Sequence, residues 1–170
     1  MNGEAYDRGV EAKGPTALPV RQRLHHAPPA WVRDGALFFI TACCAERGRA
    51  QLNRPEVFAV MVEALEHYVT AHRWWVEVFL AMPDHWHALV VFPRDERMER
   101  VMRDWKRFVA KRAAVVWQDG FFDHRLRSHE SANEKWHYIA MNPVRRGLCA
   151  EPEDWPWKWR ADEKASGTAG

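Results

Sequence analysis

The sequence predicts an α+β fold built on an antiparallel sheet, and three observations lead to this prediction. Short runs of aromatic and β-branched residues alternate with longer segments in which apolar residues recur every three or four positions. These segments follow the order strand, helix, strand, strand, helix, strand, helix. Hydrophobic residues make up 47% and charged residues 28% of the 170 residues, a balance typical of one globular domain with a sizeable core.

The first strand is predicted over residues 37–43, a short apolar run followed by turn residues. A helix is then expected from Pro55 to near His72, because apolar residues recur at helical spacing between them. Asn53 is the predicted cap of this helix, and Pro55 suits its first turn.

The middle of the chain predicts a β-hairpin followed by a second helix. Residues 74–81 and 85–92 are both rich in strand-forming residues, and the interruption at 82–84 (Met-Pro-Asp) predicts a tight antiparallel turn. Apolar residues keep one helical face over about residues 96–117, so a long amphipathic helix is expected there.

A fourth strand and a third helix complete the predicted core. Residues 121–126 follow Gly120 and read as a strand, and Ser131 with Glu134 forms a predicted capping box that opens the helix. The helix is expected to close at Asn142, because the residue before a proline is disfavoured in helical geometry. The resulting βαββαβ order is that of a ferredoxin-like or RRM-like sheet with an appended C-terminal helix.

The ends of the chain are expected to lie outside this fold. Residues 1–34 lack hydrophobic periodicity and predict a mobile N-terminal arm, residues 35–160 form the single predicted domain, and residues 161–170 predict a disordered tail. The segment 155–159 contains a proline, so it is expected to pack along the domain edge and not as a central strand.

Composition excludes several classes of protein. The apolar runs are far shorter than the roughly 20 residues of a membrane-spanning helix, and no secretory signal is recognisable, so a cytoplasmic protein without a membrane partner is expected. Three cysteines without a CxxC pair fit neither a disulfide framework nor a thiolate zinc site. The net charge of +2 does not by itself demand a nucleic-acid partner.

Two groups of residues are candidates for chemistry. His85 and His87 are two apart on a predicted strand, so both imidazoles can face one metal ion while Trp86 points away. Tyr138 and Asn142 are four apart on the third helix and share one of its faces. The structural alternatives are ordinary strand histidines, a tyrosine at the edge of the core, and an asparagine that only ends its helix.

A basic stripe is the third candidate feature. Its members follow one another at spacings of three and four on the second predicted helix: Arg100, Arg103, Arg107 and Lys111. Such a stripe can bind a phosphate backbone, and it can equally be the solvated face of a helix.

Several motifs together resemble the REP-associated tyrosine transposases, which are single-tyrosine members of the HUH endonuclease superfamily. The motifs occur in order at 38–41 (FFIT), 82–87 (MPDHWH), 117–118 (WQ), 120–124 (GFFDH) with Arg127, and 138–148 (YIAMNPVRRGL). The similarity extends over roughly residues 20 to 160, and the joint occurrence is far more specific than any one motif.

The resemblance implies a site and an activity. His85 and His87 correspond to the HUH histidines, Tyr138 to the nucleophile, and Asn142 to a third metal-facing residue that is glutamine in related transposases. The implied activity is nicking and rejoining of single-stranded DNA at hairpins, with Mg²⁺ or Mn²⁺, through a 5′-phosphotyrosine intermediate. The basic stripe, Arg145 and Arg146 are the candidate DNA-binding residues, and His124 matches a family histidine of unassigned role.

Two other functions remain open on sequence alone. One is a non-catalytic RRM-like protein that binds single-stranded nucleic acid, and the other is a metal enzyme of unrelated chemistry that uses His85 and His87. The sequence also leaves open whether the chain acts as a monomer or a homodimer, and whether Tyr138 serves the histidines of its own chain or of a partner.

Overall fold

The computed structural model describes residues 29–32, 35–127 and 129–161. The predicted arm and tail therefore lie almost entirely outside the described residues. In chain order the elements are β1 (Leu37–Cys43), α1 (Pro55–Thr70), β2 (Trp75–Ala81), β3 (His85–Val91), α2 (Met98–Ala113), β4 (Phe122–Arg125), α3 (His129–Ala140), α4 (Asn142–Arg145), the 3₁₀ turn η1 (Pro152–Asp154) and β5 (Lys158–Arg160).

The strands form one five-stranded sheet in the order β4-β1-β3-β2-β5. Every neighbouring pair is antiparallel, and β3 lies at the centre between β1 and β2. The hairpin predicted between residues 74 and 92 is present, with Ala81 opposite Trp86 at its closed end. These observations confirm the α+β fold class.

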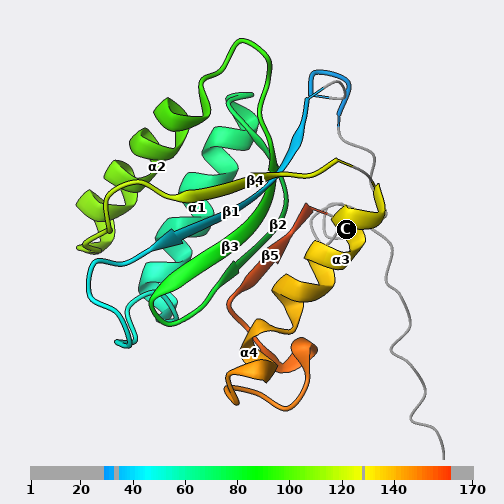
Figure 1. Cartoon of the computed structure of the whole chain (residues 1–170). Coiled ribbons are helices and arrows are strands. Elements are labelled where there is room, and N and C mark those ends of the chain that lie inside the picture. Colours follow the sequence, from blue (N-terminus) through cyan, green and yellow to red (C-terminus); the bar gives the residue numbers. More distant parts are fainter. Residues whose placement is uncertain (1–28, 33–34, 128, 162–170) are drawn as a thin grey trace, which may run out of the picture.

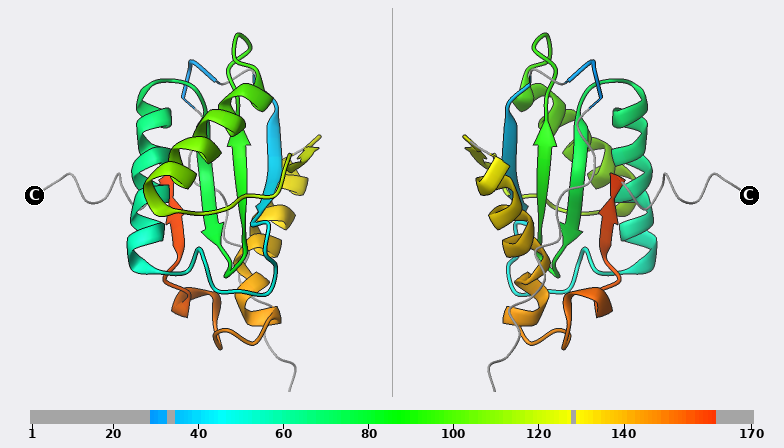
Figure 2. Two further views of the ribbon diagram at one scale, coloured as in Figure 1. Left: turned by 90° about the vertical axis from the view of Figure 1, so that its left-hand side faces the viewer. Right: turned by 90° about the vertical axis from the view of Figure 1, so that its right-hand side faces the viewer.

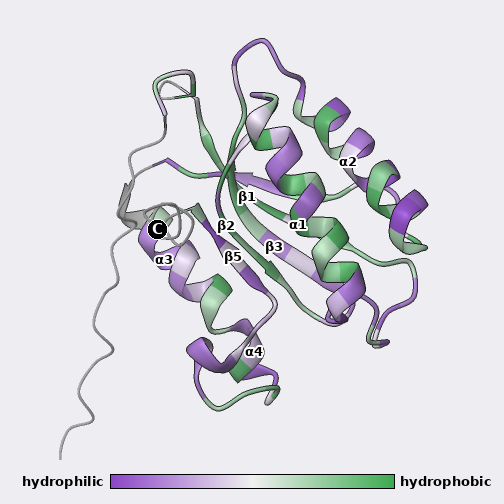
Figure 3. Ribbon diagram, turned by 180° about the vertical axis from the view of Figure 1, so that it is seen from behind, coloured by the Kyte–Doolittle hydropathy of each residue, from purple (hydrophilic) through white to green (hydrophobic). Residues whose placement is uncertain are grey.

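The helices cover the two faces of the sheet unequally. Helices α1 and α2 pack together on one face, and α3 lies across the other (Figures 1 and 2). Hydrophobic and hydrophilic residues alternate along α1 and α2 (Figure 3), as the period of about 3.6 residues requires when one side of a helix is buried. The sheet therefore has a core on each side.

Tryptophan and phenylalanine fill the core beneath α1 and α2. Trp74, Phe79, Trp86 and Trp105 are fully buried there, and the rings of Trp86 and Trp105 are 5.2 Å apart. Four such side chains remove a large apolar area from water. The strand β3 that carries Trp86 is consequently held from this side along its length.

The second core lies beneath α3. The sheet contributes Phe39, Leu80 and Leu89 to it. Helix α3 contributes Ile139, and the segment before β5 contributes Trp155. The indole Nε1 of Trp155 donates a hydrogen bond to the carbonyl oxygen of Ala81 at 2.9 Å, which satisfies its one polar atom. This core places α3 directly over the central strands.

The predicted second helix is too long at its C-terminal end. Helix α2 stops at Ala113, and Ala114 adopts a left-handed conformation with φ of 53°, as helix C-termini often do. Val116, which falls within the predicted helix, is 66% exposed. Trp117 instead forms an isolated β-bridge with Cys44.

Two predicted helix starts are also wrong. The N-cap of α1 is Arg54 and no side chain caps it, so Asn53 does not have the predicted role. Helix α3 begins at His129, two residues before the predicted cap Ser131. The segment at 155–159 lies at the domain edge as expected, and its last residues enter the short edge strand β5, which the sequence did not predict.

Candidate active site

The two histidines occupy the first and third positions of β3, so their side chains project from the same face of the sheet. Trp86 between them points to the opposite face, into the core beneath α2. Both histidines are only 6% exposed, and their ring centroids are 4.8 Å apart. The alternation of a strand thus brings the two imidazoles together, as the spacing predicted.

The Nδ1 atom of each imidazole is hydrogen-bonded to a different side chain. Nδ1 of His85 lies 2.6 Å from Oδ1 of Asp84, and Nδ1 of His87 lies 2.8 Å from Oγ1 of Thr41. Such bonds fix the orientation and tautomer of an imidazole that binds a metal through its other nitrogen. The Nε2 atoms are therefore the candidate ligating atoms.

Asp84 is itself held in place. Its Oδ2 accepts a hydrogen bond from the backbone N–H of Gly48 at 2.7 Å and lies 3.3 Å from Nε of Arg47. Burial opposes ionisation of this carboxyl, but the hydrogen bonds from Gly48 and His85, together with the charge of Arg47, outweigh it. The pKa of Asp84 is consequently lowered, and the group is a carboxylate.

Burial also determines the state of the histidines. It lowers the pKa of His85, and the neighbouring carboxylate of Asp84 offsets only part of that effect. For His87, burial together with the nearby His85, Arg146 and Arg47 lowers the pKa to about 3. Both imidazoles are therefore neutral at pH 7, which is the form that binds metals.

Tyr138 of α3 reaches the same place. Its ring centroid is 6.1 Å from that of His87 and 5.9 Å from that of Phe39, whose ring is also stacked on His87. The side chain is 39% exposed, so the ring touches the histidine face while remaining open to solvent. The structure thus brings Tyr138 and the histidine pair of one chain together.

Cationic side chains surround the tyrosine ring. The guanidinium carbon of Arg145 is 5.0 Å from its centroid and Nζ of Lys135 is 5.7 Å from it. The charge of Arg146 acts on both histidines. The face that carries the histidines is therefore positively charged and suits an anionic ligand.

Among the described residues, Asn142 forms its side-chain hydrogen bond with α3 and not with the histidines. It is the first residue of α4, because a continuous helix would drive the ring of Pro143 into a carbonyl of the preceding turn. Its Nδ2 donates a hydrogen bond to the carbonyl oxygen of Tyr138 at 2.8 Å. The Oδ1 atom, which is the atom that could bind a metal, does not take part in this bond.

The basic stripe lies elsewhere. Arg100, Arg103, Arg107 and Lys111 belong to α2, which covers the face of the sheet opposite to the histidines (Figure 1). Arg100 and Arg103 lie 3.9 Å and 3.5 Å from the carboxylate of Asp104. The structure therefore does not bring the stripe to the candidate active site, whereas it does bring Arg145 and Arg146 there.

Three residues that orient this site were not among the predicted site residues: Thr41, Asp84 and Arg47. Asp84 could have been noticed, because it directly precedes His85. Thr41 becomes a partner of His87 only through the β1–β3 pairing, in which the two residues are directly opposite. His124 lies on the exposed strand β4 opposite Phe39, and the structure gives it no role.

Within the described residues, no group of three or more His, Cys, Asp and Glu side chains is arranged to hold a metal ion. No helix of that part of the chain has the length and apolarity needed to span a membrane.

Comparison with known proteins agrees with the motifs. No family model matches the chain. A REP-associated tyrosine transposase of Escherichia coli K12 is 25% identical over 85 residues, covering 48% of this chain and about half (52%) of that protein. A Haemophilus influenzae protein that provisionally carries the same name is 24% identical over 151 residues, covering 77% of this chain and 84% of that protein.

A solved structure shares the fold. It is described as a REP-associated tyrosine transposase bound to a REP hairpin, and it superposes with a TM-score of 0.68 at 21% identity, over 78% of this chain and 81% of the other. The chain is therefore a relative of DNA transposases. Among these it is similar to the REP-associated tyrosine transposases, which confirms the resemblance seen in the motifs.

Proposed function

We propose that this protein is a metal-dependent single-strand DNA endonuclease and transposase that cuts and rejoins DNA at hairpins, with Tyr138 as its nucleophile. The observation that carries the proposal is the 6.1 Å separation of the Tyr138 and His87 rings on one positively charged face. A phenol, a pair of neutral imidazoles and arginines together suit attack on a phosphodiester. The hairpin in the similar solved structure supports hairpin DNA as the substrate.

The phenol oxygen of Tyr138 forms a bond to phosphorus as the bond between phosphorus and the 3′-oxygen breaks. The phenol loses its proton, the 3′-oxygen gains one, and the 5′-phosphate stays on the tyrosine. The phosphotyrosine is a phosphodiester like the bond it replaces, so a 3′-hydroxyl can reverse the step without ATP. Cleavage and joining can thus use the same residues.

His85 and His87 are the residues that would hold a divalent cation, and they fit this role. Both are neutral, both are oriented through Nδ1, and both leave Nε2 for a ligand. Asn142 remains the proposed third ligand through Oδ1. When bound, Mg²⁺ or Mn²⁺ would offset the negative charge that develops on the phosphoryl oxygens.

The cationic side chains near Tyr138 have a different role from that of the histidines. Arg145 and Lys135 lie beside its ring, and Arg146 lies near the histidines. They would attract the DNA backbone and hold the scissile phosphate next to the phenol. Because Tyr138 meets the histidines of its own chain, we propose that one chain forms a complete site.

The test is a covalent capture assay. A pool of labelled hairpin oligonucleotides with single-stranded flanks is mixed with the protein and Mn²⁺ and resolved on a denaturing gel. We expect a labelled protein band for the wild type and none for His87→Ala or Tyr138→Phe. His67→Ala and Tyr68→Phe, on α1 across the sheet, are the matched controls and should retain the band.

Two outcomes would contradict the proposal. A band that survives in Tyr138→Phe would assign the nucleophile to another residue. Tight binding of the oligonucleotides by every variant without a band from any would favour the non-catalytic binder of single-stranded nucleic acid.

A further inference from the structure

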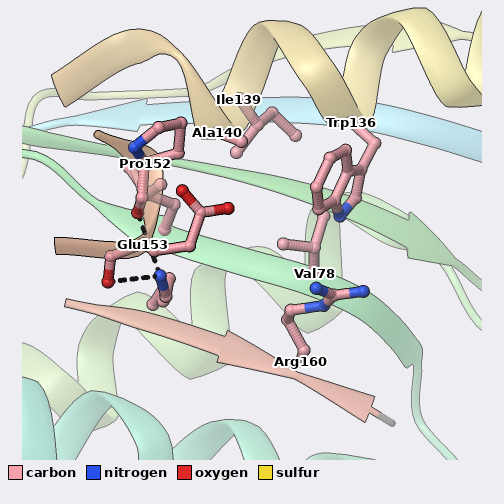
Figure 4. Close-up of a pocket in the computed structure, with 9 residues that line it drawn as sticks. Val78, Trp136, Ile139, Ala140, Pro152, Glu153 and Arg160 are labelled. Carbon is pink, nitrogen blue, oxygen red and sulfur yellow. Dashed lines mark hydrogen bonds between the residues drawn. The ribbon is translucent and has the colours of Figure 1, made fainter. Parts of the chain in front are cut away.

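A cavity of about 120 Å³ lies between α3, β2, β5 and the turn η1 (Figure 4). Val78 and Leu80 of the sheet and Ile139 of the helix give it apolar walls, and Trp136, Glu153 and Arg160 add polar groups. An apolar pocket with a few convergent polar groups is the usual form of a site for a small organic group. The function proposed above makes no use of it.

The cavity adjoins the candidate active site. Leu80 lines the cavity and is directly opposite His87 in the β2–β3 pairing, so the two side chains share a face of the sheet. Neighbouring strands are about 5 Å apart. Helix α3 carries both Trp136 and Tyr138. A nucleotide whose phosphate lies beside Tyr138 therefore has this cavity within reach of its own base or of the next one.

The walls of the cavity suit a flat aromatic ring. The indole of Trp136 and the carboxylate of Glu153 lie on opposite sides of the space in Figure 4. The guanidinium carbon of Arg160 lies over the indole ring at 5.0 Å from its centroid, which adds a second planar group to this part of the wall. Stacking on aromatic side chains and on guanidinium groups is the usual way in which proteins hold unpaired bases.

The polar groups favour one kind of base. A carboxylate only accepts hydrogen bonds, and guanine presents two adjacent donors, N1–H and N2–H, that can pair with its two oxygens. Thymine presents one donor between two carbonyl oxygens, which the carboxylate repels.

The position of Glu153 is fixed by its backbone. Nζ of Lys158 donates hydrogen bonds to the carbonyl oxygens of Pro152 and Glu153, at 2.9 and 3.0 Å. Those bonds, dashed in Figure 4, tie η1 to β5 while they leave the carboxylate of Glu153 turned into the cavity. The backbone that carries this acceptor is thus held in place before any ligand arrives.

We propose that this cavity binds an unpaired guanine of the DNA strand next to the phosphate that is cut, with Glu153 reading the base edge and Trp136 stacking on the ring. The proposal rests on the function proposed above. It adds a site that would select the nucleotide beside the cleavage point.

The experiment follows the indole N–H signals of ¹⁵N-tryptophan-labelled protein by NMR during titration with dGMP or dTMP, which carry the same phosphate and differ in the base. The Trp136 signal is assigned from its loss in Trp136→Phe. We expect dGMP to shift it at a concentration at least tenfold lower than dTMP does. Glu153→Gln should abolish this preference, and Glu99→Gln, an equal change of charge at an exposed position on α2, should retain it.

Equal shifts with the two nucleotides would overturn the proposal, since they would report phosphate binding alone. An unmoved Trp136 signal at saturating dGMP would overturn it too, and so would a preference that survives Glu153→Gln. The titration needs neither metal nor cleavage. A failure here therefore differs from a failure of the covalent capture assay, which tests Tyr138 and His87 and does not involve this cavity.

Discussion

Oγ1 of Thr41 lies 2.8 Å from Nδ1 of His87, and the two residues are directly opposite each other on β1 and β3. The bond is made at the centre of the sheet, where both backbones are hydrogen-bonded on either side. The hydroxyl therefore sets the ring of His87 in one orientation from a rigid base. Removal of the Thr41 hydroxyl should therefore weaken metal binding by Nε2 of His87 more than it destabilises the fold.

We expect Thr41→Val to weaken Mn²⁺ binding by about 10- to 100-fold, the usual loss when a partner of a ligating histidine is removed. The cost in stability should be about 1–3 kcal/mol, because Nδ1 of His87 is left buried and unpaired. Calorimetric titration with Mn²⁺ and urea unfolding measure the two effects. Thr41→Ser keeps the hydroxyl and should bind Mn²⁺ like the wild type; equal weakening in both variants would show that the hydroxyl is not what prepares His87 for the metal.

The meeting of Tyr138 and His87 within one chain predicts that two inactive variants do not rescue each other. A mixture of His87→Ala and Tyr138→Phe should form no covalent adduct in the capture assay, because no chain in it has a complete site. Recovery of roughly a quarter or more of the wild-type band would mean that α3 of one chain serves the histidines of another. Analytical ultracentrifugation of the same mixture would then show a dimer.

The placement of the arginines predicts which of them bind a strand at the active site. Arg145→Ala and Arg146→Ala should each weaken binding of unstructured single-stranded DNA and reduce the slope of log K against log salt by about 0.7. Arg107→Ala on α2 should leave both quantities unchanged, because α2 covers the opposite face. A reduced slope in Arg107→Ala would show that α2 binds DNA as the sequence suggested.

Glu77 predicts a pH dependence of stability. Burial raises the pKa of its carboxyl to about 7 from an ordinary 4.5, and its Oε2 has no hydrogen-bond partner among the described residues. The native state therefore binds more protons than the unfolded state between these two values, so this residue lowers stability as pH rises from about 4.5 to 7. The full effect is up to about 3 kcal/mol, at 1.36 kcal/mol per pKa unit.

Glu77→Gln removes the ionisation and should stabilise the protein at pH 8 but hardly at pH 4.5. Urea unfolding at both values tests this, with Glu99→Gln as the exposed control. An equal gain at the two pH values would show that packing, and not charge, causes the difference.

The sequence predicted the sheet better than the ends of the helices. Strand β1 was placed at its observed bounds, because an apolar run between turn residues has few alternatives. The end of α2 was missed, since Val116 continues the helical spacing of the apolar residues, and only the bridge from Trp117 to Cys44 marks the change to extended backbone. Tertiary contacts decided this boundary, and periodicity does not report them.

Only part of the site was predicted, because its other residues are brought together by tertiary contacts. His85 and His87 are two positions apart on one strand, so the two-residue period of a strand was enough to predict that their side chains share a face. The motif resemblance identified Tyr138, whereas its approach to His87 depends on how α3 packs over β3. Thr41 and the cavity beside Trp136 arise from strand pairing and from η1, which no local pattern describes. The metal role of the histidines and Asn142 stays a prediction.

The two outer strands, β4 with four residues and β5 with three, are far shorter than the seven-residue strands between them. Charged side chains occupy both, among them Asp123, Arg125, Lys158 and Arg160. Unpaired strand edges invite other chains to add on and begin aggregation, and short charged edges resist this. The protein can thus keep a long, hydrogen-bonded centre beneath its histidines without offering long unpaired strands to neighbouring molecules in a crowded solution.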